Sequence, residues 1–250
     1  MIKTKLRKEV AVTVPIQGAI VPGRRMPFSS FFTPVAFSDD IVNYIDELNK
    51  SKAGAVIFEI NSPGGEAYAS KQIGDAIKRL NKPKVALIKA HGTSGAYWIA
   101  SACDKIIADP LSDVGSIGTI TTHFNLSELL EKIGIDVKSL STGKFKDVGS
   151  PFKKMSKEGE EFIKEHLEAV NKEFVNEIKA NRKIEDEETL KKLTSGKPFL
   201  GREAQELGLV DHLGDRTKAM EVACELAGKT LVLKPYIRRR TLLERFLERW

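Results

Sequence analysis

Hydrophobic residues near the start of the chain follow two different spacings, one typical of strands and one typical of helices. Residues Val10 to Ile20 are rich in β-branched and apolar side chains and end at Pro22-Gly23, a turn signal. A helix with Ser38 as its N-cap is predicted next, because apolar residues recur at helical spacing at Phe37, Ile41, Ile45 and Leu48.

Three short, continuous apolar runs with β-branched residues predict buried strands: Ala55–Ile60, Lys84–Ala90 and Lys105–Ala108. Helical patterns separate these runs. One is marked by Ile73, Ile77 and Leu80, and the other begins near Ser94. Strands that alternate with helices in this way indicate βαβ crossovers and a largely parallel sheet.

The second half of the chain has a mainly helical pattern. A long polar helix is predicted from Ser156 to Arg182, and shorter ones follow over Asp186–Thr194, Arg202–Leu207 and Thr217–Ala227. The sequence contains no internal repeat and no low-complexity linker. We therefore expect one α/β domain over residues 1–233 with a helical C-terminal part, followed by a tail, residues 234–250.

Composition is that of an ordinary globular protein, with 41% hydrophobic and 30% charged residues. No apolar run approaches the roughly 20 residues that a membrane-spanning helix needs. Met1 to Val10 is basic but lacks the apolar stretch of a secretory signal, so we expect a cytoplasmic protein. Cys103 and Cys224 fit neither a disulfide framework nor a metal-ligand cluster, and we expect reduced thiols and no bound metal.

The net charge of +6 is concentrated at the C-terminal end. Lys234 to Trp250 contains six basic and two acidic residues, which leaves the main domain nearly balanced and argues against nucleic acid as a partner. Leu242, Leu243, Phe246, Leu247 and Trp250 would share one helical face of this basic, amphipathic tail. Three roles stay open: packing on the protein or a neighbouring subunit, peripheral contact with an anionic membrane surface, and entry into the active site as a self-substrate.

Two predicted strand-to-helix turns have unusual compositions. The first is Asn61-Ser62-Pro63-Gly64-Gly65, where paired glycines let the backbone approach a ligand and a helix N-terminus leaves amides free. Such amides suit an anion or a developing oxyanion, although a tight turn without further function accounts for the pattern equally well.

The second turn is His91-Gly92-Thr93-Ser94-Gly95-Ala96-Tyr97-Trp98. A serine between small residues at this point can expose its hydroxyl as a nucleophile while the next amide stays free. The alternative is that Ser94 only caps the helix. A nucleophile also needs a base, which in a chain with four histidines and many lysines is either a histidine or a lysine that burial keeps neutral.

Four motifs in order resemble the signal peptide peptidase A family of serine peptidases, which shares the fold of the Clp protease subunit and the crotonases. They are Asn61 to Gly65, Ser94 to Ala100, Gly115-Ser116-Ile117-Gly118, and Gly143 to Pro151. The resemblance covers about residues 10–213. It implies a ClpP/crotonase-like α/β fold, a superhelix of repeated β-β-α units with a largely parallel sheet.

Carried over residue by residue, the resemblance makes Ser94 the nucleophile and Lys146, the lysine directly before an aspartate, the general base. Ser116 matches the serine that orients this lysine, and the amides of Gly65 and Gly95 match the oxyanion donors. Lys144 is the nearest competitor for the base. Two departures are Ala96, where the family has a second glycine, and the missing N-terminal anchor or export signal, which leaves substrate and compartment open.

The resemblance implies a serine endopeptidase with a Ser-Lys dyad that needs no cofactor. Peptides, unfolded proteins or membrane-associated segments such as signal peptides would be its substrates, and relatives of this length assemble as homo-oligomers. It would work in the cytoplasm or peripherally at the inner face of the membrane. Two alternatives are a crotonase-type acyl-CoA enzyme, for which Glu66 is the nearby carboxylate, and an inactive assembly or membrane scaffold with the same fold.

Overall fold

The computed structural model describes residues 9–24 and 34–236. Contacts divide the chain into two compact units, which are treated separately below. The first unit comprises Met1–Ile117 and Glu177–Trp250, and the second comprises Gly118–Asn176. The predicted helix of the tail and the aromatic loop around Pro27 and Phe31 lie outside the described residues.

The first unit is built on an eight-stranded sheet with the path β10-β1-β4-β5-β6-β9, in which all neighbours are parallel. β7 adds in parallel to β5, and β8 pairs antiparallel with β7. A separate ribbon joins β2 and β3. The strands are β1 (Glu9–Gln17), β2 (Ala19–Val21), β3 (Val35–Phe37), β4 (Ala55–Ser62), β5 (Lys84–Thr93), β6 (Lys105–Ala108), β7 (Asp113–Gly115), β8 (Pro198–Leu200), β9 (His212–Leu213) and β10 (Leu231–Pro235).

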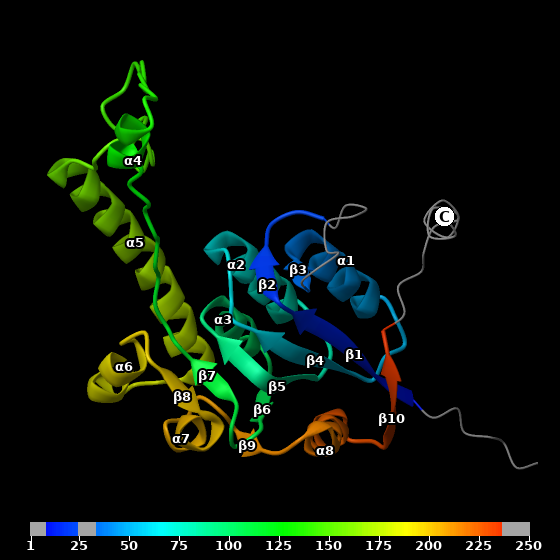
Figure 1. Cartoon of the computed structure of the whole chain (residues 1–250). Helices are drawn as coiled ribbons and strands as arrows, with labels where there is room; N and C mark the ends of the chain where they lie inside the picture. The colour runs from blue at the N-terminus through cyan, green and yellow to red at the C-terminus, as the bar shows by residue number, and fades with distance from the viewer. Residues whose placement is uncertain (1–8, 25–33, 237–250) are drawn as a thin grey trace, which may run out of the picture. The chain divides into compact units, whose positions relative to one another are not determined.

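Helices cover both faces of this sheet, with α1, α2 and α3 on one face and α8 on the other (Figure 1). Ile57, Val85 and Leu87 belong to one hydrophobic cluster with Val222 of α8. Because side chains alternate along a strand, the fully buried Phe58 and Ile60 face the opposite layer. The helices of the first unit are α1 (Ser38–Asn49), α2 (Ala67–Lys78), α3 (Gly95–Ser101), α6 (Glu187–Leu193), α7 (Gly201–Glu206) and α8 (Arg216–Ala227).

The predicted order of strands and helices is confirmed, and Lys105–Ala108 has the predicted bounds. One local prediction is wrong: Phe37, not Ser38, is the N-cap of α1, and Ser38 is its buried first residue, with an Oγ that has no hydrogen-bond partner. Cys103 and Cys224 are free thiols. Burial raises the pKa of the Cys103 thiol well above its usual range, so this group is a neutral core residue.

The second unit has little hydrophobic core. It contains α4 (Ser127–Lys132) and most of α5 (Lys157–Arg182), the long helix that the sequence predicted. Phe174 is its only buried hydrophobic residue among the described ones. Eleven large hydrophobic side chains are exposed in it: Ile120, Phe124, Leu126, Leu129, Ile133, Ile135, Val137, Leu140, Phe145, Phe152 and Phe162. An apolar surface of this extent is typical of a protein–protein contact.

Within the described ranges, no helix combines the length and apolar character that crossing a bilayer requires.

Candidate active site

Ser94 lies at the junction between β5 and α3 in a conformation that is rare for a residue with a side chain. Its φ is 53° and its ψ is −127°. Neighbouring backbone holds it there: the Ser94 amide donates to Gly115 O at 2.7 Å, and Ser94 O accepts from the amides of Tyr97 at 2.9 Å and Trp98 at 3.1 Å. Non-glycine residues at positive φ typically cost about 1–3 kcal/mol and concentrate at functional sites.

The hydroxyl of Ser94 makes no hydrogen bond to the N-terminus of α3, the helix that follows it. Ser94 is the N-cap residue of α3, yet its side chain makes no capping hydrogen bond. The alternative in which Ser94 serves only as a cap is therefore wrong. A half-buried hydroxyl at a helix N-terminus, free of structural hydrogen bonds within the described part of the chain, is suited to nucleophilic attack.

The loop of Gly64 and Gly65 packs directly against the serine turn. A side chain at Gly64 would place its Cβ 2.8 Å from Gly95 N and 2.9 Å from the Cβ of Ser94. The loop is fixed from the other side by β2, because the Ile20 amide donates to Gly64 O at 2.9 Å and the Glu66 amide donates to Ile20 O at 2.9 Å. Glycine is required here because only backbone fits.

The amides of Gly65 and Gly95 lie next to each other and are both available. Neither donates a hydrogen bond to any described residue, and a Cβ built on Gly95 would lie 3.5 Å from Gly65 N. Two free amides beside a serine hydroxyl form the arrangement that stabilises the oxyanion of acyl transfer.

Ser116 follows β7 as Ser94 follows β5, and it too has a positive φ, of 49°. Thr93 pairs with Gly115 in the sheet, so the two serines follow neighbouring strand ends. Ser116 Oγ donates to Gly196 O at 2.9 Å, and the Ser116 amide donates to Lys197 O at 3.1 Å. The Ser116 oxygen keeps its lone pairs for a donor such as a lysine. The first unit thus brings Ser94, Ser116, Gly65 and Gly95 together.

Lys146 belongs to the second unit, where it lies exposed in a series of turns. Its amide donates to Gly143 O at 3.1 Å. The neighbouring charges are paired with one another: Lys144 with Glu158 at 2.9 Å, and Lys153 with Asp147 at 2.6 Å. Lys146 makes no ion pair with any described residue. Lys144 and Lys146 therefore differ in that only Lys144 has a charged partner among the described residues.

The sequence offered two other acid–base groups near the serine turn, His91 and Glu66. His91 Nδ1 lies 3.2 Å from Asp113 Oδ2, and its amide donates to Asn61 Oδ1 at 3.2 Å. Glu66 is exposed at the start of α2. No cluster of three or more histidine, cysteine, aspartate or glutamate residues within the described ranges could hold a metal ion.

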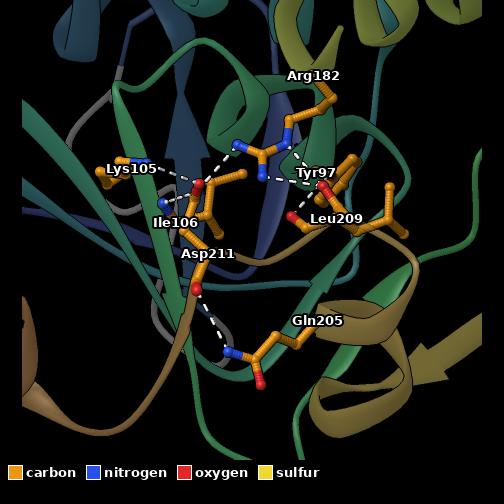
Figure 2. A network of polar contacts seen from close by, with 8 residues as sticks. Tyr97, Lys105, Ile106, Arg182, Gln205, Leu209 and Asp211 are labelled. Carbon is orange, nitrogen blue, oxygen red and sulfur yellow. Dashed lines mark hydrogen bonds and ion pairs between the residues drawn. The ribbon is translucent and has the colours of Figure 1, made fainter. Parts of the chain in front are cut away.

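A polar network that includes Tyr97 of α3 was not predicted from the sequence (Figure 2). Tyr97 Oη donates to Leu209 O at 2.9 Å, and Arg182 donates to Gly208 O through Nε at 3.1 Å and Nη2 at 2.9 Å. Arg182 Nη1 also donates to Asp211 Oδ2 at 3.0 Å. This network connects the end of α5 and α3 to the turn before β9.

Burial opposes ionisation of Asp211, but its partners outweigh that effect. The charge of Arg182 and the hydrogen bonds from Arg182, the Ile106 amide and Lys105 hold the pKa of Asp211 below its usual range. The buried phenol of Tyr97 has a raised pKa and stays neutral. The network therefore contributes structure to the site rather than proton transfer.

The fold is shared with known proteases. A membrane-bound stomatin-specific protease, 1510-N, superposes with a TM-score of 0.60 at 14% sequence identity, over 93% of this chain and 100% of that one. ClpP1 from Listeria monocytogenes superposes with a TM-score of 0.53 at 16% identity, over 83% and 93% of the two chains. These likenesses confirm the ClpP-like α/β fold that the motifs predicted.

The sequence comparisons assign the family. Residues 76–230 match the model of peptidase family S49, and the chain belongs to this family. A relative from Methanocaldococcus jannaschii, MJ0651, is 34% identical over 189 residues, which are 74% of this chain and 60% of that protein. The chloroplastic serine protease SPPA of Arabidopsis thaliana is 29% identical over 194 residues, 76% of this chain but only 28% of that protein. The resemblance to signal peptide peptidase A relatives is confirmed.

Proposed function

We propose that this protein is a serine endopeptidase in which Ser94 attacks the peptide carbonyl and Lys146 is the general base. One observation carries the proposal. The Ser94 hydroxyl, which makes no capping hydrogen bond, lies beside the free amides of Gly65 and Gly95. Membership of a peptidase family supports the same reaction.

The proposed reaction is acyl transfer in two halves. Ser94 Oγ bonds to the carbonyl carbon while its proton passes to neutral Lys146 Nζ. The amides of Gly65 and Gly95 hold the resulting oxyanion, and one such donor is typically worth about 3–4 kcal/mol. The carbon–nitrogen bond then breaks, and Lys146 returns the proton to the leaving amine. Water repeats the sequence on the acyl-enzyme and releases the acid.

Ser116 would orient Lys146 by accepting a hydrogen bond from Nζ. Its own hydroxyl proton is directed at Gly196 O, which leaves the oxygen free to act as that acceptor. Because the base works as a neutral amine, hydrolysis should increase toward alkaline pH.

Intact mass after reaction with a peptidyl fluorophosphonate tests the dyad. Wild-type protein should gain one adduct, and Ser94→Ala should gain none. Lys146→Ala should react far more slowly, while the matched variant Lys144→Ala should react at close to the wild-type rate. A variant that combines Ser94→Ala with Lys146→Ala should hydrolyse peptides little more slowly than either single variant, because the effects of substitutions within one catalytic unit are not additive. Labelling of Ser94→Ala at the wild-type rate contradicts the assignment.

We also propose that the chain forms a homo-oligomer in which Ser94 and Lys146 of neighbouring subunits complete each site. The exposed apolar side chains of the second unit, which carries Lys146, support such an association. Mixing inactive Ser94→Ala with inactive Lys146→Ala should restore part of the activity by subunit exchange. No recovery when exchange is demonstrated independently would mean that each chain holds a complete site.

Peptides, unfolded proteins or membrane-associated segments are the proposed substrates, and contact with an anionic membrane through residues 234–250 is a further part of the proposal. Co-sedimentation with anionic vesicles tests the contact. The full chain should pellet and a chain ending at Pro235 should remain in solution, and high salt should weaken binding. Equal behaviour of the two chains would remove the tail from the proposal.

A further inference from the structure

Ser70 lies in α2 beside the two proposed oxyanion donors. Its side chain is fully buried, and its Oγ donates to Glu66 O at 2.9 Å. The Ser70 amide donates to the same carbonyl at 3.0 Å. Glu66 directly follows Gly65, so the hydroxyl is bonded to the loop that supplies the first donor. A helical serine that bonds to the carbonyl four residues earlier commits its proton to the backbone.

The same hydroxyl contacts the residue that supplies the second donor. A Cβ built on Gly95 would lie 2.1 Å from Ser70 Oγ and 3.0 Å from Ser70 Cβ. Gly95 is not among the glycines with positive φ, so its backbone conformation would accept a side chain. Glycine is needed at this position because Ser70 occupies the space where a side chain would lie. One Cα–H of Gly95 therefore points at the Ser70 oxygen.

We infer that Ser70 is a positioning residue of the oxyanion hole, whose buried hydroxyl fixes the Gly95 amide against the loop of Gly65. The inference rests on the proposed function. Ser70 contacts neither substrate nor reacting atoms. It acts through the two glycines, and donors of this kind work only when they are held within about 0.5 Å of the productive geometry.

Ser70→Ala tests the inference because it removes the oxygen from between Glu66 and Gly95. We expect kcat for a peptide substrate to fall about tenfold with KM unchanged, less than the roughly 10²–10³-fold cost of losing a whole donor. The inhibition constant of a peptide aldehyde, whose Ser94 adduct places its oxygen between the two amides, should rise by the same factor. The affinity of the corresponding product peptide should not change.

Ser101→Ala is the matched control. Ser101 is another buried helical serine whose Oγ donates to a backbone carbonyl, that of Trp98 at 2.7 Å. Both substitutions remove a hydroxyl bonded to a helix carbonyl, and both should lower the melting temperature. Only Ser70→Ala should change kcat and aldehyde inhibition. If the two variants behave alike, or if Ser70→Ala changes KM alone, the inference is wrong.

A double variant gives an independent readout. Gly95→Ala should be nearly inactive because its methyl group meets Ser70 Oγ. Adding Ser70→Ala removes that atom and leaves the nearest side-chain contact at 3.0 Å, so the double variant should be more active than Gly95→Ala alone. Purely additive losses would overturn the inference. Failure of the proposed function looks different, because Ser94→Ala would then still hydrolyse peptide.

Discussion

The two units of this protein present their proposed catalytic groups in opposite ways. In the first unit, Ser94 and the amides of Gly65 and Gly95 are held by backbone hydrogen bonds and by contacts in which no added atom fits. In the second unit, Lys146 projects from turns on a segment that buries only Phe174 among its described hydrophobic residues.

Under the proposed function, this difference has a consequence for how the site is completed. The proposed nucleophile and oxyanion donors depend on backbone geometry and would be in place once the first unit folds. The proposed base lies on a unit with little core and would need further contacts to hold it, which the proposed association of subunits would supply. Substitutions in the first unit should therefore act through local geometry, and those in the second unit through association.

The largest effect should come from Gly65→Ala. The new Cβ would lie 2.0 Å from Ile20 O and 2.6 Å from Ile20 N, so the loop must move away from β2 and carry its amide out of place. We expect kcat to fall by about 10²–10³, the cost of one lost donor.

Gly134→Ala in the second unit is the control, since its added Cβ has no neighbour within 4 Å. That variant should lose some stability because Gly134 has a φ of 76°, but it should keep most of its activity. Equal losses of activity in the two variants would contradict the comparison.

An intermediate effect is expected for Arg182→Met, which removes three hydrogen bonds of the network under α3. Loss of a half-buried ion pair of this kind should lower the free energy of unfolding by about 2 kcal/mol at neutral pH. The matched variant Lys164→Met breaks an exposed pair with Glu160 in the second unit and should change little. Urea unfolding of both variants checks this.

The Arg182 effect should depend on pH. Because the folded-state pKa of Asp211 is lowered, its charge stabilises the fold above its unfolded pKa of about 3.9 and loses this effect as pH falls through the folded value. The stability difference between wild type and Arg182→Met should therefore shrink below about pH 4. A difference that stays constant down to acid pH would mean that the Asp211 charge is not involved.

The smallest effect on stability should come from Ile133→Ser, at a side chain that is 60% exposed in the second unit. Such a change should alter the unfolding free energy of the isolated chain by only about 0.5 kcal/mol or less. Its effect should appear instead in sedimentation, as a shift toward smaller assemblies at the same concentration. A variant that assembles as wild type does would place Ile133 outside the subunit contact.

The buried strands were predictable because they are short continuous apolar runs, and β6 has the predicted bounds. β7 and β8 were not predicted, since three residues each are too few to show a periodicity. Their pairing depends on partners far apart in sequence, such as Gly115 with Pro198. The cap of α1 was assigned to Ser38 by residue type, whereas the chain enters the helix one residue earlier, at Phe37.

Some residues of the candidate site were likewise visible in the sequence, and others were not. Ser94 and the paired glycines stand out in the sequence because small residues at a strand-to-helix turn are locally unusual. Ser70 resembles any serine in a helix, and its one signal is a hydroxyl on the apolar stripe that includes Ala69 and Ile73. Composition did not distinguish Lys146 from the other lysines. The resemblance did so, because the family pattern places the lysine directly before an aspartate, here Asp147.

The use of glycines around the proposed oxyanion hole also has an evolutionary consequence. Single nucleotide changes in glycine codons often give alanine or serine, and at Gly64 or Gly95 either residue would put a Cβ within 3 Å of another atom. Most of the surrounding core lies away from these glycines and would persist after such a change. A lineage with this fold could therefore lose peptide hydrolysis in one step and keep its shape and assembly. A search of related sequences for active enzymes should therefore check for glycine at the positions of Gly64 and Gly95 as well as for serine at the position of Ser94.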